Sequence, residues 1–297
     1  MSAARTPSSF ARATLVALLC VIWGSTWIVI RGGLDDLPPL TSAGARFLLA
    51  ALVMSALAPW LAPREGGGRA PLRLSLVVGV LQFGVSYAAV YWAETRLPSG
   101  IVSVLWAVNP LLMAIATQRY LRGEKLDVRQ WTGLAVGFGG VALLFFRDLD
   151  RFGAGAVPAA LVLFVSPLAS AIATTIVKRQ GEGVSSVELN RNGMWIGAAC
   201  LCAAAFALER DASVTWTGAA IGSVAYLAVI GTVVAFGLYF WLLRHTAAHR
   251  LSLISYVTPA IALLLGAWLG GEELTRYTIG GSVAILIGVA LVVGRRR

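Results

Sequence analysis

The sequence predicts an all-α integral membrane protein in which ten transmembrane helices form two inverted five-helix repeats around a central cavity. Three observations support this fold class: the composition, the spacing of apolar runs and an internal repeat. Of the 297 residues, 58% are hydrophobic and 13% are charged, and the mean hydropathy is +0.79. A water-soluble core of this size cannot hide so much apolar surface, so the composition indicates a bilayer as the solvent.

Ten apolar runs follow one another along the chain, and at about 20 residues each is long enough to cross the hydrocarbon core of a bilayer. Short connections separate them, which leaves no room for a soluble domain. The predicted spans are residues 11–30, 41–61, 72–92, 99–120, 130–146, 156–177, 189–208, 216–243, 251–270 and 277–294.

The chain also repeats itself. The apolar stretch around Pro110 returns around Pro259, 149 residues later, and the corner Gly123-Glu124 returns 148 residues later as Gly271-Glu272. Because this spacing is about half the chain, the sequence predicts two homologous halves. The predicted repeats are residues 1–147 and 148–297.

Orientation follows from the number of spans and from the basic residues. Five spans per half is an odd number, so the second half enters the membrane upside down, a construction typical of secondary transporters with a site at the midplane. With the N-terminus inside, 17 of the 24 lysines and arginines fall on inner segments, which predicts that both termini are cytoplasmic. The net charge of +10 is spread over short loops, so we expect no nucleic-acid partner.

Hydroxyl, amide and aromatic side chains on several predicted spans are candidates for a substrate cavity. Ser103, Trp106 and Pro110, for example, follow one another at three- and four-residue spacing and share a helix face. A cavity lined in this way is neutral, aromatic and hydroxylated, which suits small zwitterions or apolar metabolites. For each residue the alternative is packing within the bundle or, for a serine, a bond to its own helix backbone. The candidates are Trp23, Ser25, Gln82, Ser86, Tyr87, Tyr91, Ser103, Trp106, Asn109, Ser166, Ser170, Thr174, Tyr226, Thr232, Tyr239, Ser252, Ser255 and Tyr256.

Two prolines are predicted hinges. Pro110 and Pro259 each free the carbonyl four residues earlier, that of Trp106 or Ser255, and bend the helix. In lipid a freed carbonyl is tolerated only where neighbours or a wet cavity satisfy it, so the expected pair of kinks points to the cavity. The alternative is that the prolines only shape packing.

Ionisable residues are scarce within the spans. Arg46 is the only charged side chain placed inside one; its burial costs at least about 2.5 kcal/mol, so we expect it to reach the interface or to bond Asp35 or Asp36. No carboxylate or histidine falls near a span midpoint, where proton relays usually lie. The sequence therefore favours facilitated or weakly coupled transport, without a cofactor or metal.

Glycines recur on the fifth and tenth predicted spans. Small-residue faces let helices approach closely in a membrane, so we predict a packing role for them and no chemistry. They are Gly133, Gly137, Gly140, Gly280, Gly281 and Gly288.

Several short motifs, in order and at specific spacing, resemble the drug/metabolite transporter superfamily in its EamA-type, ten-helix branch. They include Trp23-Gly24-Ser25-Thr26-Trp27, Ala45-Arg46-Phe47-Leu48, Asn109-Pro110 and Gly271-Glu272-Glu273-Leu274. The resemblance is strongest to exporters of aromatic and other amino acids. It implies a secondary exporter in the bacterial inner membrane, working by alternating access, with a cavity formed by helices 1, 3, 4, 6, 8 and 9 and with helices 5 and 10 outside it. One departure is the start of helix 6, where Ser166 to Ser170 lacks the tryptophan of many relatives.

The expected partners are a small-molecule substrate and membrane lipid, and we favour a monomer. An exporter of drugs, lipids or hydrophobic metabolites would have a similar cavity and remains an alternative. A transporter of phosphorylated sugars would need Lys or Arg in the cavity. A lipid-modifying membrane enzyme would need acidic, His or Cys groups converging from several helices, which these spans do not supply, so we predict a protein that is not an enzyme.

Overall fold

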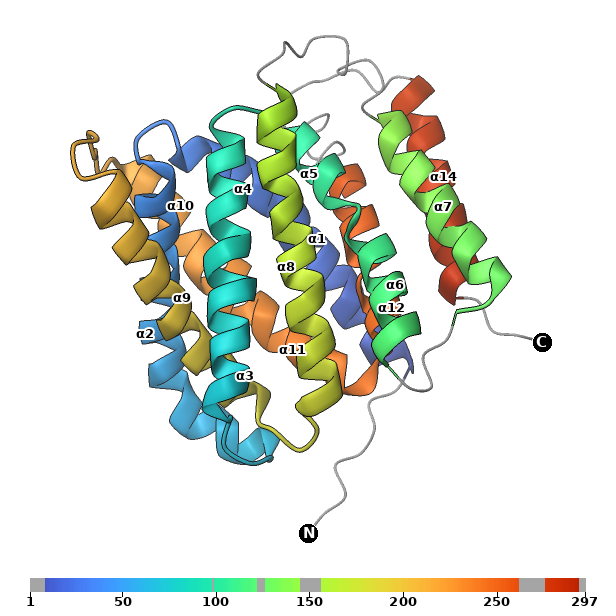
Figure 1. Ribbon diagram of the computed structural model, residues 1–297, viewed down its shortest axis with the longest axis horizontal. Helices are drawn as coiled ribbons and strands as arrows, with labels where there is room; N and C mark the ends of the chain where they lie inside the picture. Colours follow the sequence, from blue (N-terminus) through green and yellow to red (C-terminus); the bar gives the residue numbers. More distant parts are fainter. Residues whose placement is uncertain (1–8, 98, 122–125, 145–155, 262–275, 294–297) are drawn as a thin grey trace.

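The computed structural model describes residues 9–97, 99–121, 126–144, 156–261 and 276–293, and within these ranges the chain is helical, with no β-strand. Figure 1 shows the helices side by side in one bundle. They are α1 (Ser9–Gly33), α2 (Pro39–Glu65), α3 (Leu72–Leu76), η1 (Val77–Val85), α4 (Ser86–Glu94), α5 (Ser99–Trp106), α6 (Asn109–Tyr120), α7 (Val128–Leu144), α8 (Ala156–Gln180), α9 (Ser186–Leu208), α10 (Gly218–Ala228), η3 (Val229–Val234), α11 (Ala235–His245), α12 (Ala248–Leu251) and α14 (Arg276–Val293), with a further helical segment at 254–261. The repeated corners Gly123-Glu124 and Gly271-Glu272 lie outside the described residues.

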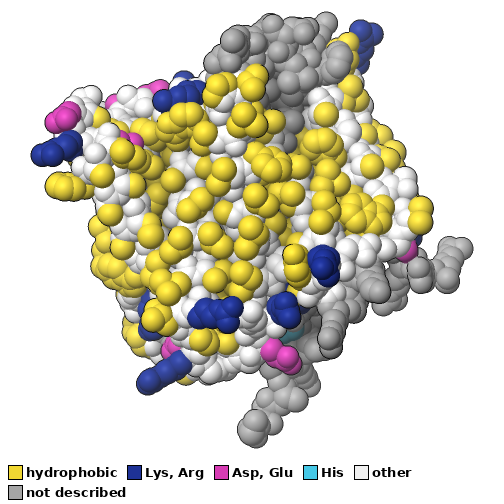
Figure 2. All heavy atoms as spheres, viewed as in Figure 1, with side chains coloured by type: hydrophobic (Ala, Val, Ile, Leu, Met, Phe, Trp, Pro, Cys, Tyr) yellow, Lys and Arg dark blue, Asp and Glu magenta, His cyan; other side chains and the backbone are white. Residues whose placement is uncertain are grey.

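The surface of the bundle is that of a membrane protein. On the face shown in Figure 2, hydrophobic side chains cover the middle, and Lys, Arg, Asp and Glu lie towards the two ends. An exposed apolar area of this extent marks contact with lipid. Within the described ranges, six continuous helical stretches are long and apolar enough to cross a bilayer, which confirms the predicted all-helical membrane protein. They are Phe10–Gly33, Pro39–Glu65, Leu72–Glu94, Val157–Gln180, Ser186–Leu208 and Gly218–His245.

Helices α7 and α14 lie against one another at one edge of the bundle (Figure 1). A Cβ atom on Gly133 would lie 2.7 Å from the carbonyl oxygen of Gly288, and one on Gly140 would lie 2.8 Å from that of Gly281. No larger residue fits at these positions, because a side chain would meet the backbone of the facing helix. The predicted close packing of the two glycine faces is confirmed.

Helices α2 and α9 also pack along one another, and each ends where the other begins. At one end, the Glu65 carboxylate at the end of α2 accepts hydrogen bonds from the first amides of α9, those of Ser186 and Val187, both at 3.2 Å. At the other end, the Glu209 carboxylate after α9 accepts from the amides of Leu40 and Thr41 in α2, both at 2.8 Å. We call these arrangements the Glu65 clasp and the Glu209 clasp. Each carboxylate satisfies free N–H groups and complements the positive end of a helix dipole.

Two of the long helices contain π-helical segments. Segment η1 interrupts the stretch from Leu72 to Glu94, and η3 interrupts the stretch from Gly218 to His245. A π segment holds an extra residue in the turn, and such segments are frequent at functional sites.

The two predicted proline kinks differ in form. Before Pro110 the helix is broken rather than bent: α5 ends at Trp106 and α6 starts at Asn109, with the proline in its first turn, where no N–H is needed. In the second half the break falls at 252–253, ahead of the segment 254–261 that contains Pro259. A helix break thus lies directly before Pro110 and further ahead of Pro259, and the hinge role of both prolines stays a prediction.

Candidate functional site

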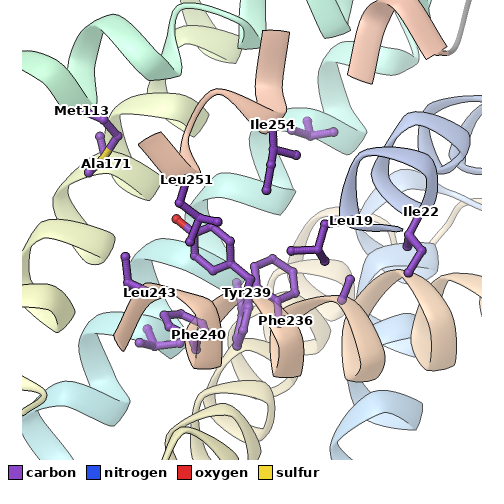
Figure 3. Close-up of a cluster of buried hydrophobic side chains, with 14 of the residues drawn as sticks. Leu19, Ile22, Met113, Ala171, Phe236, Tyr239, Phe240, Leu243, Leu251 and Ile254 are labelled. Carbon is purple, nitrogen blue, oxygen red and sulfur yellow. The ribbon is translucent and has the colours of Figure 1, made fainter. Parts of the chain in front are cut away.

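A cavity lies between the helices of both halves, and the atom-free space in and around it, open solvent included, is about 740 Å³. Its lining residues are uncharged, and most of them are aromatic, hydroxylated or aliphatic. Figure 3 shows part of the wall, where Tyr239 and Phe236 of α11 lie near Leu251 and Ile254. Among the described residues, the lining is formed by Trp23, Thr26, Trp27, Ile30, Gln82, Ser86, Tyr87, Val90, Trp106, Asn109, Ser170, Phe236, Tyr239, Leu251, Ser252, Ile254, Ser255 and Thr258.

Ten of the residues predicted for the cavity lie on this wall. They come from the first, third, fourth, sixth, eighth and ninth predicted spans, as the family resemblance implies. A role in binding substrate stays a prediction for each. They are Trp23, Gln82, Ser86, Tyr87, Trp106, Asn109, Ser170, Tyr239, Ser252 and Ser255.

Two polar atoms on the wall lack a protein partner. The indole Nε1 of Trp27 and the amide Oε1 of Gln82 are both buried without a hydrogen bond in the described part of the chain. An unsatisfied buried polar atom costs about 1–3 kcal/mol, which a bound molecule can recover. Trp27 and Gln82 thus each combine a place in the cavity lining with a polar atom that no described residue satisfies.

Aromatic rings form much of the remaining surface. Trp23 packs against Phe236 and Tyr239 with ring centroids 5.3 and 5.4 Å apart, and Phe236 also meets Tyr87 at 6.2 Å. These rings hold one another in fixed orientations. Such a surface binds apolar groups by burial and cations through the ring faces.

A hydroxyl behind the wall fixes two of its residues. Ser166 of α8 is fully buried; its Oγ accepts a hydrogen bond from Trp106 Nε1 at 2.8 Å and bonds the Ser86 hydroxyl at 2.7 Å. The neighbouring Pro167 carbonyl fixes a third, since Asn109 Nδ2 donates to it at 3.2 Å. Ser166, predicted to line the cavity, is therefore a residue that positions the lining.

Other predicted site residues lie away from the wall because they bond elsewhere. The Tyr256 hydroxyl donates to the Leu134 carbonyl of α7 at 2.9 Å. Ser25 and Tyr226 bond one another at 2.7 Å. Thr174 bonds the Tyr239 hydroxyl at 3.2 Å, so it supports a lining residue without facing the cavity. Ser103 is buried and is also absent from the lining.

Arg46 overturns a prediction. It is 1% exposed, and the hydrogen bonds of its guanidinium reach neither the interface nor the expected Asp35 or Asp36. Instead the guanidinium donates to Thr232 Oγ1 at 2.8 Å, to the Tyr91 hydroxyl at 3.3 Å and to the Gly231 carbonyl at 3.2 Å. Thr232 and Tyr91, both predicted for the cavity, hold this cation.

The guanidinium also lies 4.7 Å from the centre of the Tyr87 ring, whose side chain lines the cavity. One aromatic ring thus connects Arg46 to the cavity. Sequence reasoning missed this connection because the rotation of each helix about its axis cannot be read from a single span.

The sequence prediction also omitted most apolar lining residues. Ile30 lies two turns beyond Trp23, and Val90 lies one turn beyond Ser86 and Tyr87, so helical spacing from these candidates would have found them. Leu251 and Ile254 flank the break at 252–253, where no regular spacing applies.

Membrane-spanning helices around a central cavity lined by uncharged groups define a multi-pass membrane transporter. The model of the EamA-like transporter family matches residues 12–146 and again residues 157–294. The chain therefore belongs to the EamA-like transporter family.

Relatives agree with this assignment. The chain is 30% identical over 278 residues to a protein of Escherichia coli (strain K12) named as the uncharacterized inner membrane transporter YedA, covering 92% of this chain and 88% of YedA. It is 26% identical over 274 residues to the uncharacterized transporter YoaV of Bacillus subtilis (strain 168), covering 91% and 92%. A solved crystal structure, 17% identical, matches with a TM-score of 0.82 over 96% of this chain and 97% of its own, which shows a shared fold.

Proposed function

We propose that this transporter exports small neutral amino acids, aromatic ones included, across the bacterial inner membrane. The observation that carries the proposal is the cavity wall, which combines aromatic surface and no charged side chain with one unpartnered donor and one unpartnered acceptor among the described residues. Ligand sites commonly have this composition, with mostly apolar walls and a few polar groups that fix orientation.

An amino acid is complementary to this wall. Its carboxylate accepts from Trp27 Nε1, and its ammonium group donates to Gln82 Oε1 and faces the rings of Trp23 and Tyr87. Its side chain packs against Phe236 and the neighbouring aliphatic residues. The match uses the partner-free atoms and needs no lysine or arginine in the cavity.

We further propose ten spans in two inverted halves, with both termini cytoplasmic and transport by alternating access. Three reciprocal features support the inverted relation. The ends of α2 and α9 cap one another, the fifth and tenth spans meet through their glycines, and η1 and η3 interrupt the third and eighth spans. Halves related in this way favour two conformations of comparable energy, one open to each side.

Purified full-length protein in liposomes tests the substrate. Vesicles loaded with unlabelled tryptophan, phenylalanine or leucine should take up the labelled amino acid by counterflow, and empty liposomes should not. Gln82→Leu removes the acceptor and should weaken apparent affinity by about 5- to 30-fold, the equivalent of about 1–2 kcal/mol.

The same vesicles should ignore a nucleotide sugar, because the cavity lining described here has no cation for the phosphates. Counterflow of a hydrophobic cation without any amino-acid counterflow would show that the amino-acid proposal is wrong and that the protein is a drug exporter. If the Gln82→Leu variant transports amino acids with unchanged affinity, Gln82 is not the acceptor for the substrate.

A further inference from the structure

The carboxyl group of Glu94, the last residue of α4, is buried in an unusual setting. Its side chain is fully buried, and both oxygens lack a hydrogen-bond partner in the described part of the chain. Arg31 Nη1 donates a hydrogen bond at 2.6 Å to the backbone carbonyl of Glu94 and not to its carboxyl group. A carboxylate charge held in this way loses its hydration without replacement, which is strongly unfavourable.

Two cations lie near this end of α4: Arg31 of α1 donates to the backbone carbonyl of Glu94, and Arg46 of α2 donates to the hydroxyl of Tyr91. Tyr91 and Glu94 are three residues apart on α4 and therefore share a face of that helix, the face on which Arg46 bonds Tyr91. Among the described elements, the others packed on α4 add no charge there. Segments η1 and α5 contain no ionisable residue, and the only ones in α8 are Lys178 and Arg179 in its last turn.

Arg46 therefore has two possible sets of partners. In this structure it is bonded to Thr232 and Gly231 of η3 and to Tyr91, and the Glu94 carboxyl accepts no hydrogen bond from it. A charged Glu94 would offer Arg46 a charge-assisted and bidentate bond, which is stronger than its bonds to neutral oxygens. The first arrangement suits the neutral carboxylic acid, and the second suits the carboxylate.

We propose that Glu94 is a proton-binding site whose occupancy decides whether Arg46 bonds η3 or Glu94, and that this proton is exchanged during transport. When water delivers a proton to a Glu94 oxygen, Arg46 returns to Thr232 and Gly231; when the proton leaves to water, Arg46 pairs with the carboxylate. Since η3 continues into α11, which carries Phe236 and Tyr239, the exchange acts on the cavity wall. This proposal of transport coupled to proton exchange takes the place of the facilitated or weakly coupled transport expected from the sequence. It rests on the transporter function but not on amino acids as the substrate.

Infrared difference spectroscopy of the full-length protein in lipid tests the proton site without any substrate. The wild type should show the carbonyl stretch of a protonated carboxylic acid that Glu94→Gln lacks and that disappears as the pH is raised. Asp211→Asn, at an exposed loop residue, is the matched control and should keep the band. A spectrum in which Glu94→Gln and wild type are identical at every pH would overturn the proposal.

A pH gradient across liposomes tests the exchange. If one proton moves per substrate molecule, a gradient of one pH unit should change the accumulation ratio of labelled tryptophan about tenfold. Asp211→Asn should respond like the wild type, and Glu94→Gln should catalyse counterflow at equal pH without responding to the gradient. A wild type that transports but ignores the gradient overturns the exchange. If no amino acid is transported by any variant, the proposed substrate is wrong, and the infrared result alone decides the proton site.

Discussion

The Glu65 clasp and the Glu209 clasp use the same device at opposite ends of the α2–α9 pair, but among the described residues only the Glu65 clasp carries an ion pair. Its cation is Arg244 of α11, whose Nη1 lies 2.8 Å from Glu65 Oε1. Glu209 bonds only the amides of Leu40 and Thr41 and the Thr41 hydroxyl in the same part of the chain. Both carboxylates therefore cap a helix, and one of them also holds a second helix by charge.

The difference between the two clasps concerns the contacts of α11 at each end of the α2–α9 pair. The loops beside each clasp also bond: Gly68 pairs with Val184 near Glu65, and Thr217 donates to Asp36 near Glu209 at 2.5 Å. The scaffold is therefore reciprocal, but α11, which carries cavity residues, is tied by a charge only at the Glu65 end. Lys178 of α8 also donates to the carbonyls of Leu243 and Thr246, at 2.6 and 2.9 Å, so the Arg244 ion pair is one of several contacts at this end of α11.

The largest effect in this comparison is expected for Glu65→Ala. It removes the cap of α9 and leaves Arg244 without its carboxylate, so the free energy of unfolding should fall by about 3 kcal/mol. Unfolding in mixed detergent micelles, followed by tryptophan fluorescence, measures the loss. Glu182→Ala, at an exposed residue near the same end, should stay close to the wild type.

A smaller loss is expected for Glu209→Ala, about 1–2 kcal/mol in the same measurement, because only a helix cap is removed. A loss equal to that of Glu65→Ala would show that the ion pair adds nothing and that the two clasps are equivalent in energy.

The smallest change in stability is expected for Arg244→Gln, about 0.2–1 kcal/mol, since the pair is partly exposed. Its effect should appear in access to the cavity. A cysteine placed at Ser252 should react several-fold faster with a water-soluble maleimide once the Glu65 end is released. Unchanged labelling would mean that the ion pair does not hold this end closed.

Much of the fold could be predicted because hydropathy and repeat spacing depend on the sequence alone. The glycine contact of α7 with α14 followed from small residues on two spans, and the helices that line the cavity followed from the family resemblance. The direction of individual side chains could not be predicted. The side chain of Tyr256 bonds α7 and that of Thr232 bonds Arg46. The rotation of a helix about its axis is set by packing between elements far apart in the sequence.

Glu94 shows the same limit for charge. It lies two residues beyond the predicted span 72–92, and the sequence analysis assigned it no role. Burial depends also on the neighbouring helices, and here they enclose the side chain completely.

The π segments have a mechanical consequence. A π segment is an α-helix that holds one extra residue, and moving that residue along the helix turns the side chains it passes by about 100°, the rotation per residue of a 3.6-residue turn. Gln82 lies within η1 and Thr232 within η3. A shift of either segment can therefore rotate the cavity acceptor or the Arg46 acceptor out of place while both ends of the helix stay anchored.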